Sequence, residues 1–222
     1  MIPLKDDIPS RTFSIVNYLL IAVNLLVFGF ELSLGNHLDP FIYTHAVIPA
    51  QFVSVGLTAD QIARLTATMF FHGGWLHVLG NMLYLWIFGD NVEDRMGHFK
   101  YLVFYLIVGC FASFAHIFSF PQSGVPLIGA SGAIAGVLGA YLILYPRAKV
   151  LTLIFLFIFI QVVHIPAVVF LGFWFLLQLL SGTAGMADQG AQSVAFWAHV
   201  GGFVAGMLLV KLFATRKTNY RY

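Results

Sequence analysis

The sequence predicts an all-α integral membrane protein built as a bundle of six transmembrane helices. Of its 222 residues, 60% are apolar and only 9% are charged, and the mean hydropathy is +0.90. A soluble domain carries about 25% charged residues because its surface faces water, so this chain is expected to lie in lipid. Its apolar residues also gather in stretches of about 20, the length of a helix that crosses a bilayer. The net charge of +2 is too small to indicate a nucleic-acid partner.

Six stretches have the length and apolarity of a membrane span, in the order 13–34, 68–89, 98–120, 127–146, 164–182 and 194–213. The fifth belongs to a run from Val150 to Gly182 that is apolar almost throughout. As one helix this run would measure about 50 Å, which is too long for one span, and two spans with a turn would need more residues. We therefore expect one span that starts near Pro166, since proline suits the first turn of a helix. The segment before it is expected to lie at the membrane face or to fold against the bundle.

Lysine and arginine residues give an independent check on this count. Six spans place ten of the 11 on one side: Lys5, Arg11, Arg95, Lys100, Arg147, Lys149, Lys211, Arg216, Lys217 and Arg221. Only Arg64 falls on the other side. Positive charge marks the cytoplasmic side, so we expect a multi-pass protein of the cell membrane with both termini cytoplasmic. A seventh span would move the last four basic residues outside.

The chain is expected to have three parts. These are a cytoplasmic N-terminus at 1–12, the bundle at 13–213 with an outer loop at 35–67, and a cytoplasmic tail at 214–222. Asp6 and Asp7 precede the first span, which is longer than the apolar region of a signal peptide, so no cleavable signal is expected.

Polar side chains inside a span are costly and therefore indicate function. All nine Asp and Glu residues lie outside the spans or at their ends, which argues against an aspartyl protease and a proton-coupled transporter. No H-E-x-x-H motif supplies zinc ligands, and we expect no metal and no cofactor. The single cysteine, Cys110, allows no intrachain disulfide. The polar candidates within the spans are His77, Asn81, His116, Ser131, His164 and His199.

Three of these residues are expected to share one depth. His77, Ser131 and His199 lie 13, 15 and 12 residues before the cytoplasmic ends of their spans. These separations correspond to about 20, 22 and 18 Å at 1.5 Å per residue. That level is about a third of the way from the outer face into a hydrocarbon core of roughly 30 Å. Side chains from three separate helices can therefore meet in one plane.

Small residues continue the helix faces of Ser131 and His199. They are Ala135 and Gly139 after the serine, and Gly202 and Gly206 after the histidine. Such stripes let two membrane helices approach closely, which would bring the hydroxyl to the imidazole. Taken alone, Gly132-x-x-x-Gly136 and Gly202-x-x-x-Gly206 are packing motifs and nothing more. Packing does not require a histidine in the stripe, however.

A serine becomes a nucleophile when a base takes its proton, and histidine is the usual base. Ser131 and His199 would form a dyad, because no carboxylate is within reach. His77 and Asn81, four residues apart on one helix face, could donate hydrogen bonds to an oxyanion. The sequence Gly-Ala-Ser-Gly at 129–132 also places the serine where a loop becomes a helix, so that unpaired backbone N–H groups are available.

The chain resembles the rhomboid family of intramembrane serine proteases, in its short, six-helix bacterial form. The matching segments are HGGWLHVLGN from His72 to Asn81, GASG from Gly129 to Gly132, and AHVGG from Ala198 to Gly202 with Gly206. The resemblance implies Ser131 as nucleophile, His199 as general base, and His77 with Asn81 as oxyanion donors. His72 and Gly129 are candidates for supporting the site. The implied partners are membrane lipids and substrates that are themselves transmembrane helices, cleaved near the outer face at small residues.

Two positions depart from the family pattern, and one follows it. Relatives often carry an aromatic residue four after the serine, where this chain has Ala135. The residue that orients His199 is therefore open, with an aromatic side chain on another helix as one candidate. The Trp-Arg pair of the outer loop is Ala63-Arg64 here. Glu93-Asp94-Arg95 matches the family's cytoplasmic turn and is expected to be structural.

The remaining polar residues are expected to have structural roles. His116 and His164 lie near span ends, as interfacial residues do, and Glu31 is expected to anchor the outer loop. For the protease, a substrate helix would enter a cavity opened by the fifth span and the outer loops. The loop from Gly182 to Gln192 would act as a lid.

Two other functions compete with proteolysis. A catalytically dead relative that binds membrane helices predicts loss of the serine or the histidine, and both are present. A small channel or transporter predicts polar residues at several depths, whereas the candidates gather at one. Both alternatives are therefore weaker than the protease.

Overall fold

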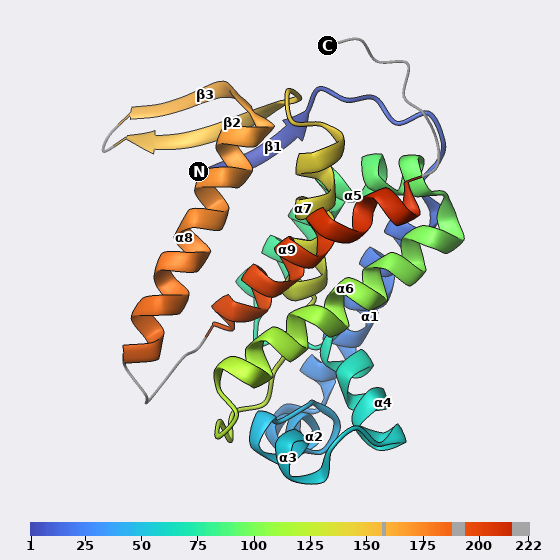
Figure 1. Cartoon of the computed structure of the whole chain (residues 1–222), viewed down its shortest axis with the longest axis vertical. Coiled ribbons are helices and arrows are strands. Elements are labelled where there is room, and N and C mark those ends of the chain that lie inside the picture. Colours follow the sequence, from blue (N-terminus) through green and yellow to red (C-terminus); the bar gives the residue numbers. More distant parts are fainter. Residues whose placement is uncertain (157–158, 188–193, 215–222) are drawn as a thin grey trace.

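The computed structural model describes residues 1–156, 159–187 and 194–214 (Figure 1). The long helices of its bundle are α1 (Ile15–Ser33), α5 (Trp75–Met96), α6 (His98–Ser119), α7 (Ser131–Leu144), α8 (Ala167–Ala187) and α9 (Phe196–Phe213). One end, here called the short-helix end, holds the 3-10 turn η1 (Gly35–His37) with α2 (Leu38–His45), α3 (Pro49–Val55) and α4 (Ala59–Thr68). The opposite end, here called the sheet end, holds β1 (Ile2–Asp6), β2 (Lys149–Leu156) and β3 (Phe159–Pro166).

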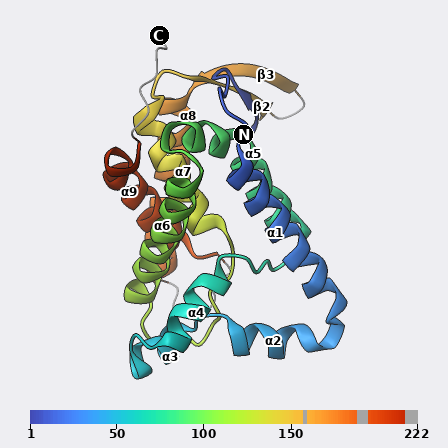
Figure 2. The same ribbon diagram turned by 90° about the vertical axis from the view of Figure 1, so that its right-hand side faces the viewer.

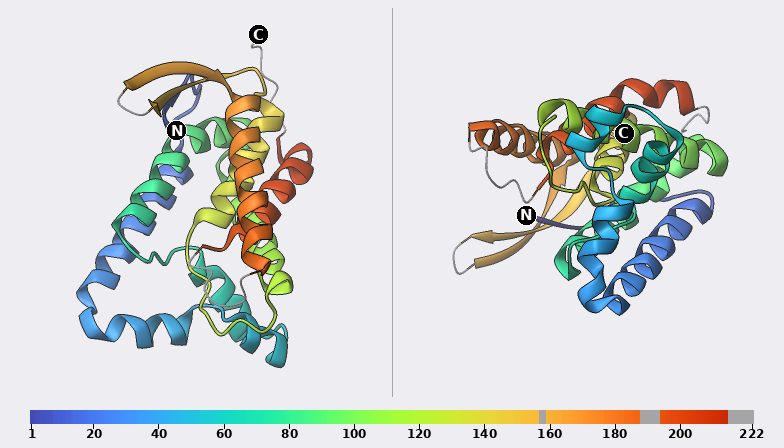
Figure 3. Two further views of the ribbon diagram at one scale, coloured as in Figure 1. Left: turned by 90° about the vertical axis from the view of Figure 1, so that its left-hand side faces the viewer. Right: turned by 90° about the horizontal axis from the view of Figure 1, so that it is seen from below.

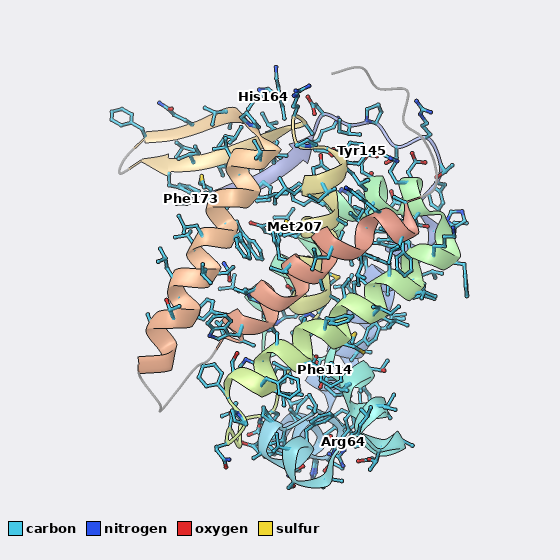
Figure 4. All side chains as sticks on the ribbon, viewed as in Figure 1. Arg64, Phe114, Tyr145, His164, Phe173 and Met207 are labelled. Carbon is cyan, nitrogen blue, oxygen red and sulfur yellow. The ribbon has the colours of Figure 1, made fainter. Side chains whose placement is uncertain are left out.

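The long helices alternate in direction along the chain (Figure 2). Helices α1, α6 and α8 run from the sheet end to the short-helix end, and α5, α7 and α9 run back. Figure 4 shows Arg64 at the short-helix end and His164 at the sheet end. Lys5 and Lys149 belong to β1 and β2. The predicted separation of Arg64 from these basic residues therefore agrees with the path of the chain.

Each predicted span overlaps one long helix. Four of them, α1, α6, α8 and α9, are long and apolar enough to cross a membrane by length and composition. Helix α7 is apolar but has only 14 residues, and α5 carries four charged residues in its last two turns. The structure thus describes a membrane protein with a helical bundle.

The second and fourth helices begin later than predicted, at Trp75 and Ser131 rather than at 68 and 127. Gly74 (φ +155°) and Gly129 (φ +124°) lie just before these starts, in backbone conformations outside the right-handed helix. Leu127 instead forms a bridge with Val47. Thr68, where the second span was predicted to begin, is instead the last residue of the separate helix α4. Both helices therefore begin shortly after a glycine with a positive φ.

The prediction of an all-α protein needs one correction, because the segment before α8 is a β-hairpin. Strands β2 and β3 pair antiparallel from Lys149 opposite Pro166 to Leu156 opposite Phe159, and β1 pairs antiparallel with β2. Seen from below, the hairpin projects beyond the helices (Figure 3). The segment is rich in Ile, Val and Phe, which favour strands. Helix α8 begins directly after Pro166, as the sequence indicated.

Buried carboxylates join α1 to the end of α5. Glu93 is fully buried and accepts hydrogen bonds from the backbone N–H groups of Val16 (3.0 Å) and Asn17 (2.7 Å). Asp94 accepts from the backbone and the hydroxyl of Thr12. The two bonds to Glu93 satisfy N–H groups in the first turn of α1 that have no partner within the helix, and those to Asp94 hold the segment just before α1. Glu93 and Asp94 thus have the structural role expected of their motif.

Helices α7 and α9 touch through their backbones. A Cβ atom added at Gly202 would lie 2.1 Å from the carbonyl oxygen of Gly132, and one at Gly206 would lie 1.9 Å from that of Gly136. A Cβ at Gly139 would lie 2.1 Å from the carbonyl oxygen of Phe203. Only glycine fits at these positions. The predicted close approach along the small-residue stripe is confirmed.

Helix α8 lies at the side of the bundle (Figure 1). Its first turn is fixed, because the backbone N–H of Ala167 donates to Ala148 (2.7 Å) and that of Val168 to Pro146 (3.2 Å). Further along, Phe175 stacks on Phe203 of α9 with ring centroids 4.8 Å apart. Its outward side chains are exposed, as expected of a helix facing acyl chains.

Asp6 links the sheet to the bundle and makes folding depend on pH. Its carboxylate accepts hydrogen bonds from Tyr141 of α7 and Asn91 of α5. Burial raises the pKa of Asp6 from 3.8 to about 7. Between these values the folded protein binds more protons than the unfolded chain, so stability falls as pH rises from about 4 to 7 and then levels off. We expect Asp6→Asn to raise the melting temperature at pH 8 and to flatten its decline between pH 5 and 8.

Thermal unfolding in detergent, followed by intrinsic fluorescence at several pH values, checks this expectation. Asp39→Asn, which changes an exposed carboxylate in α2, should give a curve parallel to that of the wild type. If the melting temperature of Asp6→Asn declined with pH in parallel with that of the wild type, Asp6 would not be the cause of the pH dependence.

Candidate active site

Ser131 and His199 meet between α7 and α9. Ser131 is the first residue of α7, and His199 lies in the first turn of α9. The Ser131 Oγ and the His199 Nε2 are 2.8 Å apart, which is hydrogen-bond distance. The close approach of α7 and α9 at their glycines brings these two residues together, although 68 positions separate them in the chain.

The other ring nitrogen of His199 has a partner that the sequence analysis missed. Its Nδ1 lies 2.8 Å from the Oε1 of Gln178 on α8. Trp174, one turn earlier on α8, holds its ring 6.0 Å from the imidazole, centroid to centroid. The aromatic residue expected from another helix is thus present, and the amide stands beside it. An amide side chain in the middle of the apolar α8 was the signal that could have identified Gln178.

His77 lies against the turn that precedes Ser131. The backbone N–H of Gly73 points to His77 Nδ1 at 3.5 Å, which leaves the Nε2 of His77 to carry the proton. A Cβ atom added at Gly129 would lie 2.7 Å from that Nε2 and 3.4 Å from Ser131 Oγ. The imidazole of His77 therefore lies against Gly129, at a position where any other residue's side chain would collide with it.

Asn81 is held by a chain of polar contacts from α1. Its Nδ2 donates to His72 Nε2 at 3.0 Å, and His72 Nδ1 donates to the carbonyl oxygen of Phe70 at 3.1 Å. The backbone N–H of His72 lies 3.2 Å from each carboxylate oxygen of Glu31. Glu31 thus anchors the segment before α5. The contacts also place His72 as support for Asn81.

These side chains border one cavity of about 560 Å³ between α5, α7, α8 and α9. Its polar lining residues are Ser131, His199, Gln178, His77, Asn81 and Tyr84. Leu76, Ile134, Leu138 and Trp174 make most of the rest of the wall apolar. Its volume falls in the range of ligand-binding sites.

The family model of the Rhomboid domain matches residues 59–216, most of the chain. The chain belongs to the rhomboid family. It is 28% identical over 198 residues to "Rhomboid protein 1, mitochondrial" of Saccharomyces cerevisiae, an alignment covering 86% of this rhomboid and 51% of the relative. It is 30% identical over 188 residues to "RHOMBOID-like protein 1" of Arabidopsis thaliana, covering 81% and 41%. It is 34% identical over 126 residues to "Rhomboid protease GluP" of Bacillus subtilis, covering 56% and 24%. The chain thus spans about half or less of the length of these relatives.

Other polar residues of this rhomboid lie away from the cavity. His164 belongs to β3 at the sheet end, and His116 lies in the last turn of α6, where its side chain is buried within the protein. The region predicted as a lid is helical to Ala187, and 188–193 lie outside the described residues, as do 215–222 of the predicted tail. Within residues 1–156, 159–187 and 194–214, no His, Cys, Asp and Glu side chains are grouped to bind a metal ion.

Gly129 should be intolerant of substitution. Its φ of +124° disfavours any side chain, and a methyl group there would collide with the imidazole of His77. We expect Gly129→Ala to displace His77 and to lower proteolytic kcat by about 10- to 100-fold, with a smaller effect on KM. The measurement is the rate of cleavage of a transmembrane reporter in vesicles.

Gly124→Ala is the matched control, because a Cβ atom at Gly124 meets nothing within 4 Å in the same connection. Equal rates for the two variants would show that Gly129 does not position His77.

Proposed function

We propose that this rhomboid is an intramembrane serine endopeptidase that hydrolyses peptide bonds in or near the transmembrane helices of other membrane proteins. The observation that carries the proposal is the 2.8 Å contact of Ser131 Oγ with His199 Nε2 at the edge of a cavity inside the helical bundle. A partly buried serine in contact with a buried histidine supplies the parts needed for nucleophilic catalysis. The name of the similar GluP protein, a rhomboid protease, supports the same reaction class.

In the proposed reaction, Ser131 Oγ attacks the carbonyl carbon of the scissile bond, and its proton passes to His199 Nε2. The tetrahedral intermediate carries its negative charge on the former carbonyl oxygen. His77 Nε2–H, the Asn81 amide and the backbone N–H of Ser131 are proposed to donate hydrogen bonds to that oxygen. Donors fixed before the reaction stabilise this charge without reorganisation.

The intermediate then collapses to products. His199 gives its proton to the leaving amine, the C–N bond breaks, and an acyl-enzyme remains on Ser131. A water molecule, deprotonated by His199, attacks the acyl carbon. Release of the carboxylate product restores the serine hydroxyl and neutral histidine, so all atoms and protons are accounted for.

We further propose that all six long helices span the membrane, with the sheet end and both termini on the cytoplasmic side of a cell membrane. Helix α7 alone measures about 21 Å, so the segments that flank it would complete its span. The basic residues Lys5 and Lys149 at the sheet end support this orientation. Substrate helices and lipids would then meet α8, whose exposed apolar face is available to both.

Labelling and cleavage together test the proposal. The purified protein, in vesicles with a single-span reporter, should release two fragments whose masses locate a bond in or near the reporter's span. A fluorophosphonate probe should add covalently to the peptide that contains Ser131, as mapped by mass spectrometry. Probe found on another serine, or an intact reporter with an unlabelled Ser131, would contradict a serine protease at this site.

A further inference from the structure

We propose that Gln178 is a positioning residue, which holds His199 in the tautomer that can act as a base. The inference rests on the proposed function, because it assigns a third member to the Ser131–His199 pair. The structural basis is a continuous row of contacts, from Ser131 Oγ to His199 Nε2 at 2.8 Å and from His199 Nδ1 to Gln178 Oε1 at 2.8 Å.

The orientation of the Gln178 amide is fixed by its other end. The Nε2 of Gln178 donates to the carbonyl oxygen of Trp174 at 3.4 Å, so Oε1 faces the imidazole. An amide oxygen can only accept a hydrogen bond. The proton of neutral His199 must therefore lie on Nδ1. The lone pair is then on Nε2, where Ser131 can donate its hydroxyl proton to it.

Without this acceptor the two tautomers would compete. The tautomer with the proton on Nε2 cannot accept from Ser131 and is inactive as a base. In this chain Ala135 presents only a methyl group one turn after Ser131. Trp174 covers the ring face and can restrain its plane, but an indole lacks an acceptor for Nδ1–H. Gln178 is thus the side chain that can select the tautomer.

Few other titratable groups affect the protonation of His199. His77 on α5 and His116 on α6 are the titratable residues whose charges act on it. The sequences of α7 and α8 contain no Asp, Glu, His, Lys or Arg. A carboxylate in place of the Gln178 amide would therefore be a new charge beside the imidazole, and its effect on the pH profile would be readily seen.

Two substitutions at Gln178 separate hydrogen bonding from packing. Gln178→Met keeps the length and volume of the side chain but removes the amide oxygen. Gln178→Glu keeps an acceptor and adds a negative charge. Leu208→Ala is the control, because Leu208 is an apolar residue of α9 that is 72% exposed and lies outside both α8 and the lining of the cavity.

The readouts are kcat and KM for a transmembrane reporter in vesicles and the rate of labelling by a fluorophosphonate, each measured from pH 5 to 9. We expect Gln178→Met to lower kcat and the labelling rate by about 10- to 100-fold with KM within about twofold. Gln178→Glu should retain activity at high pH and move the acidic limb of the profile up by about one pH unit. Leu208→Ala should resemble the wild type.

Gln178→Met with wild-type kcat, labelling rate and pH profile would overturn the proposal. If that variant does not fold, Gln178→Glu decides the question alone. A pH profile of activity that does not shift in Gln178→Glu would show that position 178 does not act on His199. The two proposals fail differently. An inactive, unlabelled wild type would refute the protease, whereas an active wild type matched by Gln178→Met would refute only the positioning role.

Discussion

Alanine at position 131 is expected to reduce cleavage of a transmembrane reporter by at least about 10⁴-fold, because loss of the nucleophile leaves only binding and oxyanion stabilisation. The substitution removes one oxygen atom at the mouth of a cavity, so folding should be preserved and the melting temperature should change little. Fluorophosphonate labelling should disappear in parallel, since the probe reacts with the same hydroxyl. Initial cleavage rates in vesicles and in-gel fluorescence of the probe provide the two measurements.

Ser113→Ala provides the control for this variant. Ser113 is buried, at 4% exposure, and lies on α6 outside the lining of the large cavity. Its replacement should leave both the cleavage rate and the probe labelling within about twofold of the wild type, because Ser113 has no part in the proposed reaction. Continued cleavage by Ser131→Ala at more than a few per cent of the wild-type rate would remove Ser131 from the mechanism.

The second large effect is expected at the contact between α7 and α9. A methyl group at Gly206 would lie 1.9 Å from the carbonyl oxygen of Gly136, so Gly206→Ala must push the two helices apart. Overpacking of this kind costs about 1–3 kcal/mol of stability. It should also lengthen the contact between Ser131 and His199, and a shift of about 1 Å can lower a rate by about 100-fold. Cleavage rate and melting temperature should therefore fall together.

Gly29→Ala makes the same chemical change on α1, where an added Cβ atom meets nothing within 4 Å. It should be neutral or slightly stabilising, because alanine favours a helix more than glycine does. If Gly206→Ala matched this control in stability and rate, the close approach of α7 and α9 would not be what joins the serine to the histidine.

The long helices and the contact of Ser131 with His199 could be predicted from the sequence, because both follow from local rules. Apolar length located the six long helices, and residue counts from their ends put His77, Ser131 and His199 at one level. Glycine spacing predicted which helices touch. Each of these inferences uses regular helix geometry, which lets positions along a chain be converted into distances.

The features that were missed depend on contacts between distant segments. The hairpin of β2 and β3 is paired with β1, from the other end of the chain, and an apolar run alone does not distinguish a strand from a buried helix. Gln178 has an evident role only once α8 lies beside α9. The turns at Gly74 and Gly129 are likewise set by tertiary packing, since glycine permits but does not require a positive φ.

The attachment of α8 gives it the geometry of a lever. Its first turn is bonded to residues 146 and 148, whereas Gln178 lies 11 positions further on, or about 16 Å along the axis. A tilt of about 10° about the fixed end would carry the Gln178 amide by about 3 Å, enough to break a hydrogen bond. Small rotations of α8 would thus separate Gln178 from His199, the base of the proposed reaction. In the proposed protease, bond cleavage would then wait until α8 returned to its position against α9.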